Sequence, residues 1–276
     1  MVGRLKSASL TFHDPQPDPT MNLSRNHSVT TLCLLAVSFL PALAAEPDAD
    51  QLLRQMSSKL AAAGTFRVVA TREIDAALLE GVDVPEKAEV TAVVQRPAKL
   101  AAISKSRHGV RRMIADGTQL TLLDERPNHY SVVPMRTTID GLVERMDQRY
   151  GFTPPLAEFA LSNPYQDLKR NAKTITYLGR GKTTAGFLGL AGVECHRLSL
   201  HGREAYAELW IGVNDQLPYQ LTATFHREGN PQVRVSFSKW QLNAPVSPSE
   251  FTFTPPKNSQ KIEMWTTDQM RSAVKR

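Results

Sequence analysis

The most conspicuous pair of reactive side chains in the sequence is Cys195 followed by His196, because a thiol beside an imidazole can act as a nucleophile with its base. Both residues fall in a stretch that alternates in the manner of a β-strand. Neighbouring side chains on a strand point to opposite faces of the sheet, so this pair cannot share a hydrogen bond. We therefore expect Cys195 to be a small core residue and His196 to lie at the surface or at a rim.

A second candidate is Gly181-Lys182-Thr183, which is similar to the end of a phosphate-binding P-loop. That motif requires a glycine five positions before Gly181, where this chain has Thr176. The sequence here predicts a basic turn between two strands.

Metal ligands would have to come from histidines that are dispersed along the chain. Those beyond residue 100 are His108, His129, His196, His201 and His226. None of them has the short paired spacing of a zinc-binding motif, and His196 and His201 could approach each other only across a bend. We predict no metal site and no cofactor.

The carboxylates do not form a catalytic pattern either. Asp116 and Asp215 lie in turn sequences, which is sufficient reason for their presence. Glu208 interrupts an apolar stretch, so it could recognise a ligand or simply face solvent on a strand. There is no Gly-x-Ser-x-Gly motif, and we expect a protein that is not an enzyme.

An N-terminal targeting segment indicates the compartment. Residues 29–40 form an apolar run, preceded by Arg25 and followed by Ala42-Leu43-Ala44. This order is typical of a secretory signal peptide, and the run is too short to span a bilayer, which takes about 20 residues. We predict a signal peptide over residues 21–44, export to the Gram-negative periplasm, and a mis-assigned N-terminal extension over residues 1–20.

Composition and charge exclude further classes of protein. A hydrophobic fraction of 41% and a charged fraction of 22% describe a globular chain, not a disordered one. The net charge of +6 is a mild excess, compatible with transient contact with an anionic membrane surface or with envelope proteins. A nucleic-acid-binding protein would carry a dense basic stripe, so we expect no nucleic-acid partner.

The chain after residue 45 predicts one helix and then a meander of strands. Asp48 or Asp50 can cap a helix that Gly64 ends, and its apolar residues recur at helical spacing as Leu52, Leu53, Met56 and Leu60. Strands with period two follow at about 66–70, 89–94, 99–104, 110–115, 120–123 and 130–133. Asp116-Gly117 is a hairpin signal, and no helix separates these strands, so they should be antiparallel neighbours.

The middle of the chain predicts two helices. The first runs from about residue 137 to residue 150 and is stopped by Gly151; its apolar face carries Ile139, Leu142, Val143 and Met146. Pro154-Pro155 begins a shorter helix with Leu156, Phe159 and Leu161, and Asn163-Pro164 is predicted to end it.

Strands return in the last part, at about 174–178, 192–200, 206–213, 219–226 and 232–240. Two of them alternate clearly between apolar and polar residues; their apolar members are Leu221, Ala223 and Phe225, and Val233, Val235 and Phe237. One wet and one dry face are typical of a curved sheet around an apolar interior. We predict one α+β domain over residues 45–262 and a charged tail over residues 263–276 that could contain a short helix.

Several stretches resemble, in the same order, those of a known superfamily. They are Ala115 to Leu122 with Asn128-His129-Tyr130, Thr138 to Ala157, Gly192 to Leu198, Leu209-Trp210-Ile211 with Leu217-Pro218, and Pro248 to Pro256. On these residues the chain resembles the LolA/LolB-like superfamily of periplasmic lipoprotein- and lipid-binding proteins. Within it, the chain is most similar to a family of predicted periplasmic proteins of unknown function.

The resemblance implies a strongly curved antiparallel sheet, a half-open β-barrel, with an N-terminal helix and a central helical lid. In such carriers the apolar interior accepts acyl chains, since burying a methylene contributes about 0.8 kcal/mol. The expected ligand contacts are Ile139, Leu142, Met146 and Phe159 from the lid, with Leu221, Phe225, Val235 and Phe237 from the sheet.

The expected function is therefore the binding or carriage of an acylated or hydrophobic ligand, such as a lipid or the acyl chain of a lipoprotein. The alternative is a protein-interaction or sensor module of the envelope that uses the same fold without lipid transport. The sequence leaves both open, because it does not distinguish a hollow barrel from a filled one.

Overall fold

The structure is a computed structural model that describes residues 46–79, 83–154, 156–183 and 192–274. The extension predicted over residues 1–20 and the signal peptide predicted over residues 21–44 lie outside the described residues. The chain from Ala45 onward packs as one unit. No helix in the described ranges is both long and apolar enough to cross a membrane.

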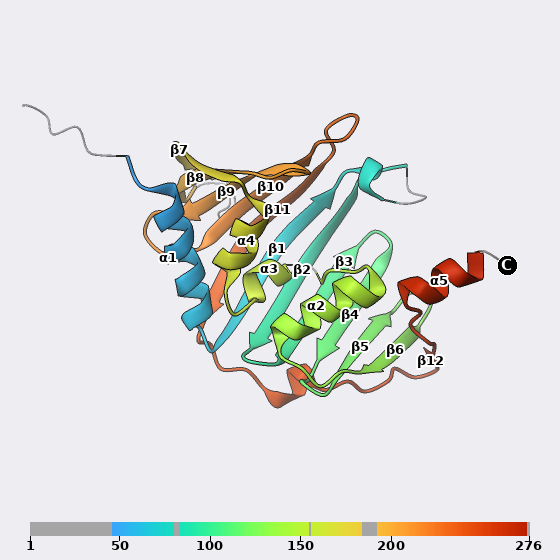
Figure 1. Cartoon of the computed structure of the whole chain (residues 1–276). Helices are drawn as coiled ribbons and strands as arrows, with labels where there is room; N and C mark the ends of the chain where they lie inside the picture. Colours follow the sequence, from blue (N-terminus) through green and yellow to red (C-terminus); the bar gives the residue numbers. More distant parts are fainter. Residues whose placement is uncertain (1–45, 80–82, 155, 184–191, 275–276) are drawn as a thin grey trace, which may run out of the picture. The chain divides into compact units, whose positions relative to one another are not determined.

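In the described part of the chain, twelve strands form one sheet that bends around the helices on its concave face (Figure 1). The strands are β1 (Thr65–Ile74), β2 (Glu86–Gln95), β3 (Lys99–Ser106), β4 (Gly109–Ala115), β5 (Gln119–Asp124), β6 (His129–Pro134), β7 (Thr174–Lys182), β8 (Glu194–His201), β9 (Ala205–Gly212), β10 (Pro218–Phe225), β11 (Gln232–Leu242) and β12 (Gln260–Lys261). Their spatial order is β12-β6-β5-β4-β3-β2-β1-β11-β10-β9-β8-β7. The sheet is open, with β12 at one edge and β7 at the other, which confirms the predicted α+β class with a curved, unclosed sheet.

The predicted hairpin at Asp116-Gly117 is confirmed. The Asp116 carboxylate accepts hydrogen bonds from the backbone N–H groups of Thr118 (2.7 Å) and Gln119 (2.9 Å), and Gly117 has a φ of 94°. This turn sets the register of β4 against β5. The strand neighbours are antiparallel as predicted, except that β12 pairs parallel to β6. A two-residue strand shows no alternation, so the sequence carried no sign of it.

Alternation along the strands places apolar side chains on the concave face. In β1, Phe66, Val68 and Ala70 are buried there, and Phe237 of β11 lies opposite Ala70. Residues between them face the other way, and one of these, Arg67, pairs with Glu250. The concave face is therefore the apolar side of the sheet, and other elements must pack on it to bury it.

Helix α1 (Ala49–Ala62), which the sequence predicted, covers one end of this face. The Asp48 carboxylate caps it by accepting a hydrogen bond from the backbone N–H of Asp50 (2.9 Å). Leu53, Met56 and Leu60 form its buried stripe and belong to the same core as the sheet residues.

The central segment forms three helices, α2 (Ile139–Tyr150), α3 (Ala157–Ala160) and α4 (Pro164–Asn171). Helix α2 ends at Gly151 in the left-handed region (φ 60°), as predicted. Helix α3 ends before Asn163-Pro164, as predicted, but this dipeptide also begins α4, a helix that was not predicted. The Asn163 side chain accepts a hydrogen bond from the N–H of Gln166, and proline suits the first helical turn, where an N–H has no partner to lose.

Arg96, which follows β2, ties two helices to the sheet. Its guanidinium donates to the carbonyl oxygens of Leu60 (3.3 Å) and Ala63 (3.2 Å) at the end of α1 and of Ala160 (2.7 Å) at the end of α3. Carbonyls at helix C-termini lack partners within the helix, and a positive charge complements the helix dipole there. Burial lowers the pKa of Arg96, but an arginine remains charged.

Asp50 joins α1 to α4. Its carboxylate accepts hydrogen bonds from the Tyr165 hydroxyl (2.9 Å), the Lys169 ammonium (3.0 Å) and the Arg54 guanidinium (2.7 Å). Burial acts to raise the pKa of Asp50, but the hydrogen bonds from Lys169, Arg54 and Tyr165 outweigh it and lower the pKa to about 2.

The remaining elements are short. A 3-10 turn, η1 (Ala76–Leu78), follows β1; η3 (Pro248–Phe251) lies between β11 and β12; and α5 (Thr267–Val274) confirms the short helix expected in the tail. Ser247 and Glu250 form a capping box at η3, and the Glu250 carboxylate also accepts a hydrogen bond from the Arg67 guanidinium.

We expect Arg96→Met to lower the free energy of unfolding by about 2–4 kcal/mol, because buried helix-end carbonyls lose a charged donor. Urea unfolding followed by circular dichroism measures the change. The matched control is Arg112→Met, which removes a more exposed arginine paired with Glu125 and should cost less than about 1 kcal/mol. Equal losses in the two variants would contradict the role given to Arg96.

The Asp50 contacts predict a defined pH dependence. An unfolded aspartate titrates near pH 3.9, whereas Asp50 in the folded chain titrates at about 2. Its stabilising contribution is therefore complete above about pH 4 and disappears as the pH falls toward 2. Asp50→Asn should destabilise the protein at pH 7, and the difference from the parent should shrink below pH 4. Urea titrations at a series of pH values test this, and a constant difference would refute it.

Candidate functional site

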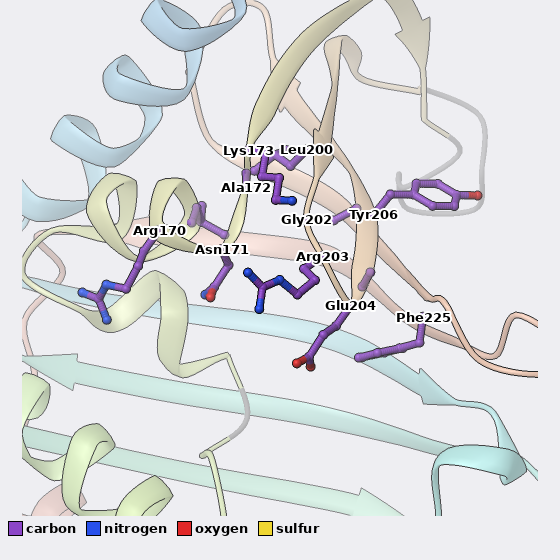
Figure 2. A pocket seen from close by; sticks show the side chains of 13 residues that line it. Arg170, Asn171, Ala172, Lys173, Leu200, Gly202, Arg203, Glu204, Tyr206 and Phe225 are labelled. Carbon is purple, nitrogen blue, oxygen red and sulfur yellow. The ribbon is translucent and has the colours of Figure 1, made fainter.

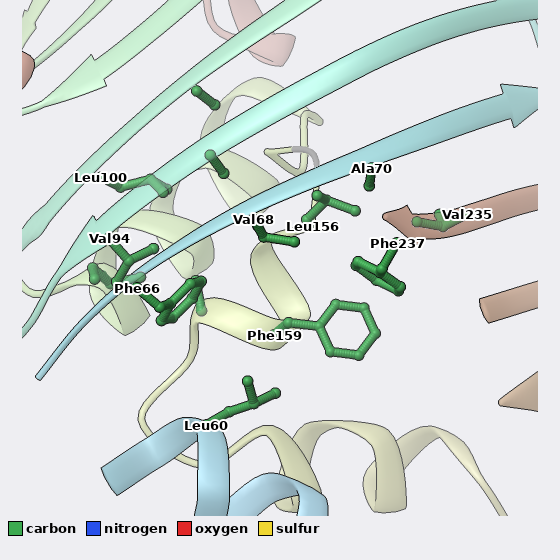
Figure 3. Close-up of a cluster of buried hydrophobic side chains, with 14 of the residues drawn as sticks. Leu60, Phe66, Val68, Ala70, Val94, Leu100, Leu156, Phe159, Val235 and Phe237 are labelled. Atoms are coloured by element: carbon green, nitrogen blue, oxygen red, sulfur yellow. The ribbon is translucent and has the colours of Figure 1, made fainter. Parts of the chain in front are cut away.

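Most of the predicted ligand contacts lie in the filled core. Six of the eight are no more than 3% exposed: Ile139, Leu142, Met146, Phe159, Val235 and Phe237. Phe159 of α3 meets Phe237 of β11 edge to face, with ring centroids 5.0 Å apart (Figure 3). The helices and the sheet are in direct contact here, so a ligand could reach these side chains only if α2 and α3 moved away.

The other two predicted residues lie where the concave face is less completely covered. Leu221 and Phe225 are both on β10 and are half-buried. Ala207 of β9 and Val233 of β11, which pair with the intervening Ala223, are half-buried too. The dry face therefore continues past the helices into a region that solvent partly reaches.

A pocket of about 490 Å³ opens in this region, between β8–β10 and the end of α4 (Figure 2). Its apolar lining comes from the sheet and from α4 with the residue after it, and consists of Leu168, Ala172, Leu200, Ala205, Ala207 and Phe225. The volume is within the usual range of small-ligand sites, about 300–1,000 Å³. Phe225 is the predicted contact that lines it.

Close backbone contacts hold the pocket together. The N–H of Lys173 donates to the carbonyl oxygen of His201 (2.7 Å). A Cβ on Gly202 would lie 2.5 Å from the carbonyl oxygen of Asn171, so the β8–β9 turn approaches the end of α4 more closely than any larger residue allows. Arg203 and Glu204, next in the turn, are thereby placed at the rim of the pocket.

A second pocket, of about 780 Å³, lies among α2, α3 and α4 and has a different character. Its lining carries one basic residue, Arg170, against the acidic residues Asp140, Glu144, Asp147, Glu158 and Asp167. Burial raises the pKa of Glu158. This pocket suits neither an apolar chain nor an anion.

Arg72 is a charged residue on the concave face that the sequence reading missed. It follows Phe66, Val68 and Ala70 in the inward alternation of β1, which was the available signal. It lies 3.5 Å from Glu86 in an ion pair, and its Nε is a buried nitrogen without a hydrogen-bond partner among the described residues. Burial lowers the pKa of Arg72.

The reactive pair of the sequence does not form a catalytic site. Cys195 is fully buried, as predicted, and burial raises its pKa to about 12, so the thiol stays protonated. The prediction that His196 lies at the surface or rim is wrong. His196 is buried, because its ring packs against Tyr177 of β7, with Nδ1 3.2 Å from the tyrosine oxygen.

Glu208 and Gly181, two further candidates from the sequence, also have structural roles. The Glu208 carboxylate accepts hydrogen bonds from Arg197 (2.8 Å) and from the Trp210 indole (2.8 Å) on the convex face. The prediction of a turn at Gly181-Lys182 is wrong, since both residues lie in β7 and pair with Cys195 and Glu194 of β8. A Cβ on Gly181 would lie 2.9 Å from the Trp210 ring, so glycine makes room for it. Within the described ranges, no three His, Cys, Asp or Glu residues gather to hold a metal ion.

The structure is thus that of an α+β protein with an open curved sheet, helices on its concave face and a partly apolar pocket at one end. Its sequence matches the family described as predicted periplasmic protein (DUF2092) over residues 49–265. The chain belongs to this family, which confirms the resemblance drawn from its motifs. No curated protein sequence matches it.

Solved structures with a similar fold share little sequence. MucB is 12% identical with a TM-score of 0.45, over 75% of this chain and 63% of that chain, so this chain spans less than two thirds of it. LprF from Mycobacterium bovis is 14% identical with a TM-score of 0.40, over 76% and 97%. A LolA superfamily protein from Nitrosomonas europaea is 9% identical with a TM-score of 0.34, over 75% and 99%.

Two phenylalanine truncations should separate core from pocket. Phe159→Ala should lower the free energy of unfolding by about 3–5 kcal/mol, because it opens a cavity in the filled core. Phe225→Ala should cost about 1 kcal/mol, since the side chain is half-buried beside an existing pocket. Chemical unfolding of both variants measures the difference, and equal costs would contradict this division of the concave face.

Proposed function

We propose that this protein is exported to the periplasm and there binds an acylated or hydrophobic ligand on the concave face of its sheet. The observation that carries the proposal is the 490 Å³ pocket, whose apolar lining runs into the half-buried part of the dry face. Its family is described as predicted periplasmic, and the signal peptide expected over residues 21–44 supplies the route.

The course of the ligand follows the sheet. An acyl chain that enters over Ala205 and Ala207 meets Phe225 and then, two positions apart along the same face of β10, Ala223 and Leu221. Each methylene that leaves water contributes about 0.8 kcal/mol without needing a polar partner. Such a site therefore favours chain-like ligands over compact polar ones.

The covered core supplies a longer site if the helices move. Phe159, Met146 and Phe237 would become contacts for a chain that advanced beyond Leu221, once α2 and α3 had moved away from the sheet. Helix α3 is a single turn whose last carbonyl is held by Arg96. In this proposal the helical cover is a lid that moves away from the sheet for loading and release.

Binding accounts for the site better than catalysis does. The thiol of Cys195 is protonated and buried, and the Glu208 carboxylate is occupied on the opposite face. The alternative, a protein-interaction or sensor module, would leave the pocket without an acyl ligand. Organic extraction of protein purified from the periplasm, followed by mass spectrometry, distinguishes them: acyl species near one per protein support binding.

Filling the pocket should abolish the proposed activity. We expect Ala207→Trp to weaken binding of a fluorescent fatty-acid probe by about tenfold or more, because the indole occupies the apolar floor, and tenfold corresponds to about 1.4 kcal/mol. Fluorescence titration measures the affinity, and circular dichroism confirms that the variant is folded.

The control for this variant is Thr222→Trp, on the neighbouring strand β10. Thr222 does not line the pocket, and it pairs with Glu208 on the convex face of the sheet. The probe should bind this variant as it binds the parent. Unchanged affinity in a folded Ala207→Trp variant would refute the pocket as the binding site.

A further inference from the structure

The rim of the apolar pocket is basic. Arg170 at the end of α4, Lys173 in the link to β7 and Arg203 in the β8–β9 turn all line it, and Glu204 is the one acidic residue beside them. All four side chains are exposed at the mouth, while Leu200 beneath them is buried. The pocket therefore combines a dry floor with a positively charged, wet entrance.

Two of these cations, Lys173 and Arg203, form no ion pair with another described residue. Arg170 lies 3.8 Å from Asp167, a weak exposed pair. Lys173 and Arg203 take part in none of the ion pairs or side-chain hydrogen bonds formed among the described residues. Their backbones are nonetheless held together, since Lys173 bonds to His201 and Gly202 fits against Asn171.

The arrangement in Figure 2 places the guanidinium of Arg203 on the same side of the pocket as the amide of Asn171, with Phe225 below. Three cations and one carboxylate leave a positive entrance directly above the apolar floor. An amphiphile with a negative head and an apolar tail matches this order of charge and dry surface.

The neighbouring acidic pocket favours one orientation of a bound amphiphile over the opposite one. It shares Arg170 and Asn171 with the basic rim, but it adds Asp140, Glu144 and Asp147 on the α2 side. An anion is repelled there and attracted to the Lys173–Arg203 side. A ligand that lies along β10 can therefore have its charged head at one end only.

From these observations we infer that the ligand is an anionic amphiphile, with a phosphate or carboxylate head held between Lys173 and Arg203 and its chain on the floor formed by Leu200, Ala205, Ala207 and Phe225. This inference rests on the proposed function and specifies its ligand class. Because the head group stays in water, its contribution is modest and sensitive to salt, whereas the chain supplies most of the affinity.

Calorimetric titration of the full mature chain with three probes tests the inference: dodecyl phosphate, dodecanol and inorganic phosphate. We expect dodecyl phosphate to bind about three- to tenfold more tightly than dodecanol, and inorganic phosphate to bind too weakly to measure. Raising the salt concentration from 0.05 M to 0.5 M should remove the advantage of dodecyl phosphate and leave dodecanol unchanged.

Variants of the rim give changes of opposite sign. The double variant Lys173→Gln with Arg203→Gln should lose the preference for dodecyl phosphate and keep its affinity for dodecanol. Glu204→Gln should strengthen binding of dodecyl phosphate by about two- to threefold, because it removes the carboxylate at the entrance. The matched control, Lys105→Gln with Lys239→Gln, removes the same charge from exposed positions on the convex face and should change neither probe.

The outcomes separate the two proposals. Equal binding of dodecyl phosphate and dodecanol in the parent overturns the head-group inference and leaves hydrophobic binding standing. Tight binding of inorganic phosphate alone overturns it in favour of a simple anion site. Failure of both chain-bearing probes to bind refutes the proposed function together with this inference.

Discussion

The structure depends on how the concave face of its sheet is covered. Antiparallel strands that alternate apolar and polar residues leave one face dry, and a bent open sheet cannot bury that face against itself. Helices α1, α2 and α3 cover the part formed by Phe66, Phe237 and their neighbours. The cover ends before the β8–β10 corner, and the pocket begins there.

A few polar contacts hold the helices in place on the concave face. Arg96 holds the ends of α1 and α3 through three carbonyl oxygens, and Asp50 holds α4 against α1. These groups lie around the apolar core rather than in it, so the helices are positioned by a few charged contacts and packed by many weak ones. The proposed function requires these contacts to open without unfolding of the sheet.

Charge is distributed unevenly around the mouth. Carboxylates from α2, α3 and α4 gather on one side, and Lys173 and Arg203 lie on the other, with Arg170 between them. The concave face of the sheet also carries the ion pair of Arg72 with Glu86. The polarity of the entrance, rather than the shape of the apolar floor, would give a bound amphiphile its orientation.

Much of the fold could be predicted because its signals are local. The strands, the hairpin at Asp116-Gly117, helix α1 and the Gly151 stop each follow from alternation, turn chemistry or capping within a few residues. The errors arose where a local signal had two meanings. Asn163-Pro164 both ends one segment and begins the next helix, and His196 is buried by Tyr177, which lies in another strand.

The sequence by itself determined the α+β class, the dry face of each strand and the family, since these depend on residue order alone. Only the tertiary structure decided which apolar side chains are in contact with one another. It placed Phe159 against Phe237 as filled core and left Phe225 at a pocket. It also joined Lys173 to a turn almost thirty residues further along the chain. Proximity between distant segments depends on sheet curvature and helix placement, which no short stretch of residues encodes.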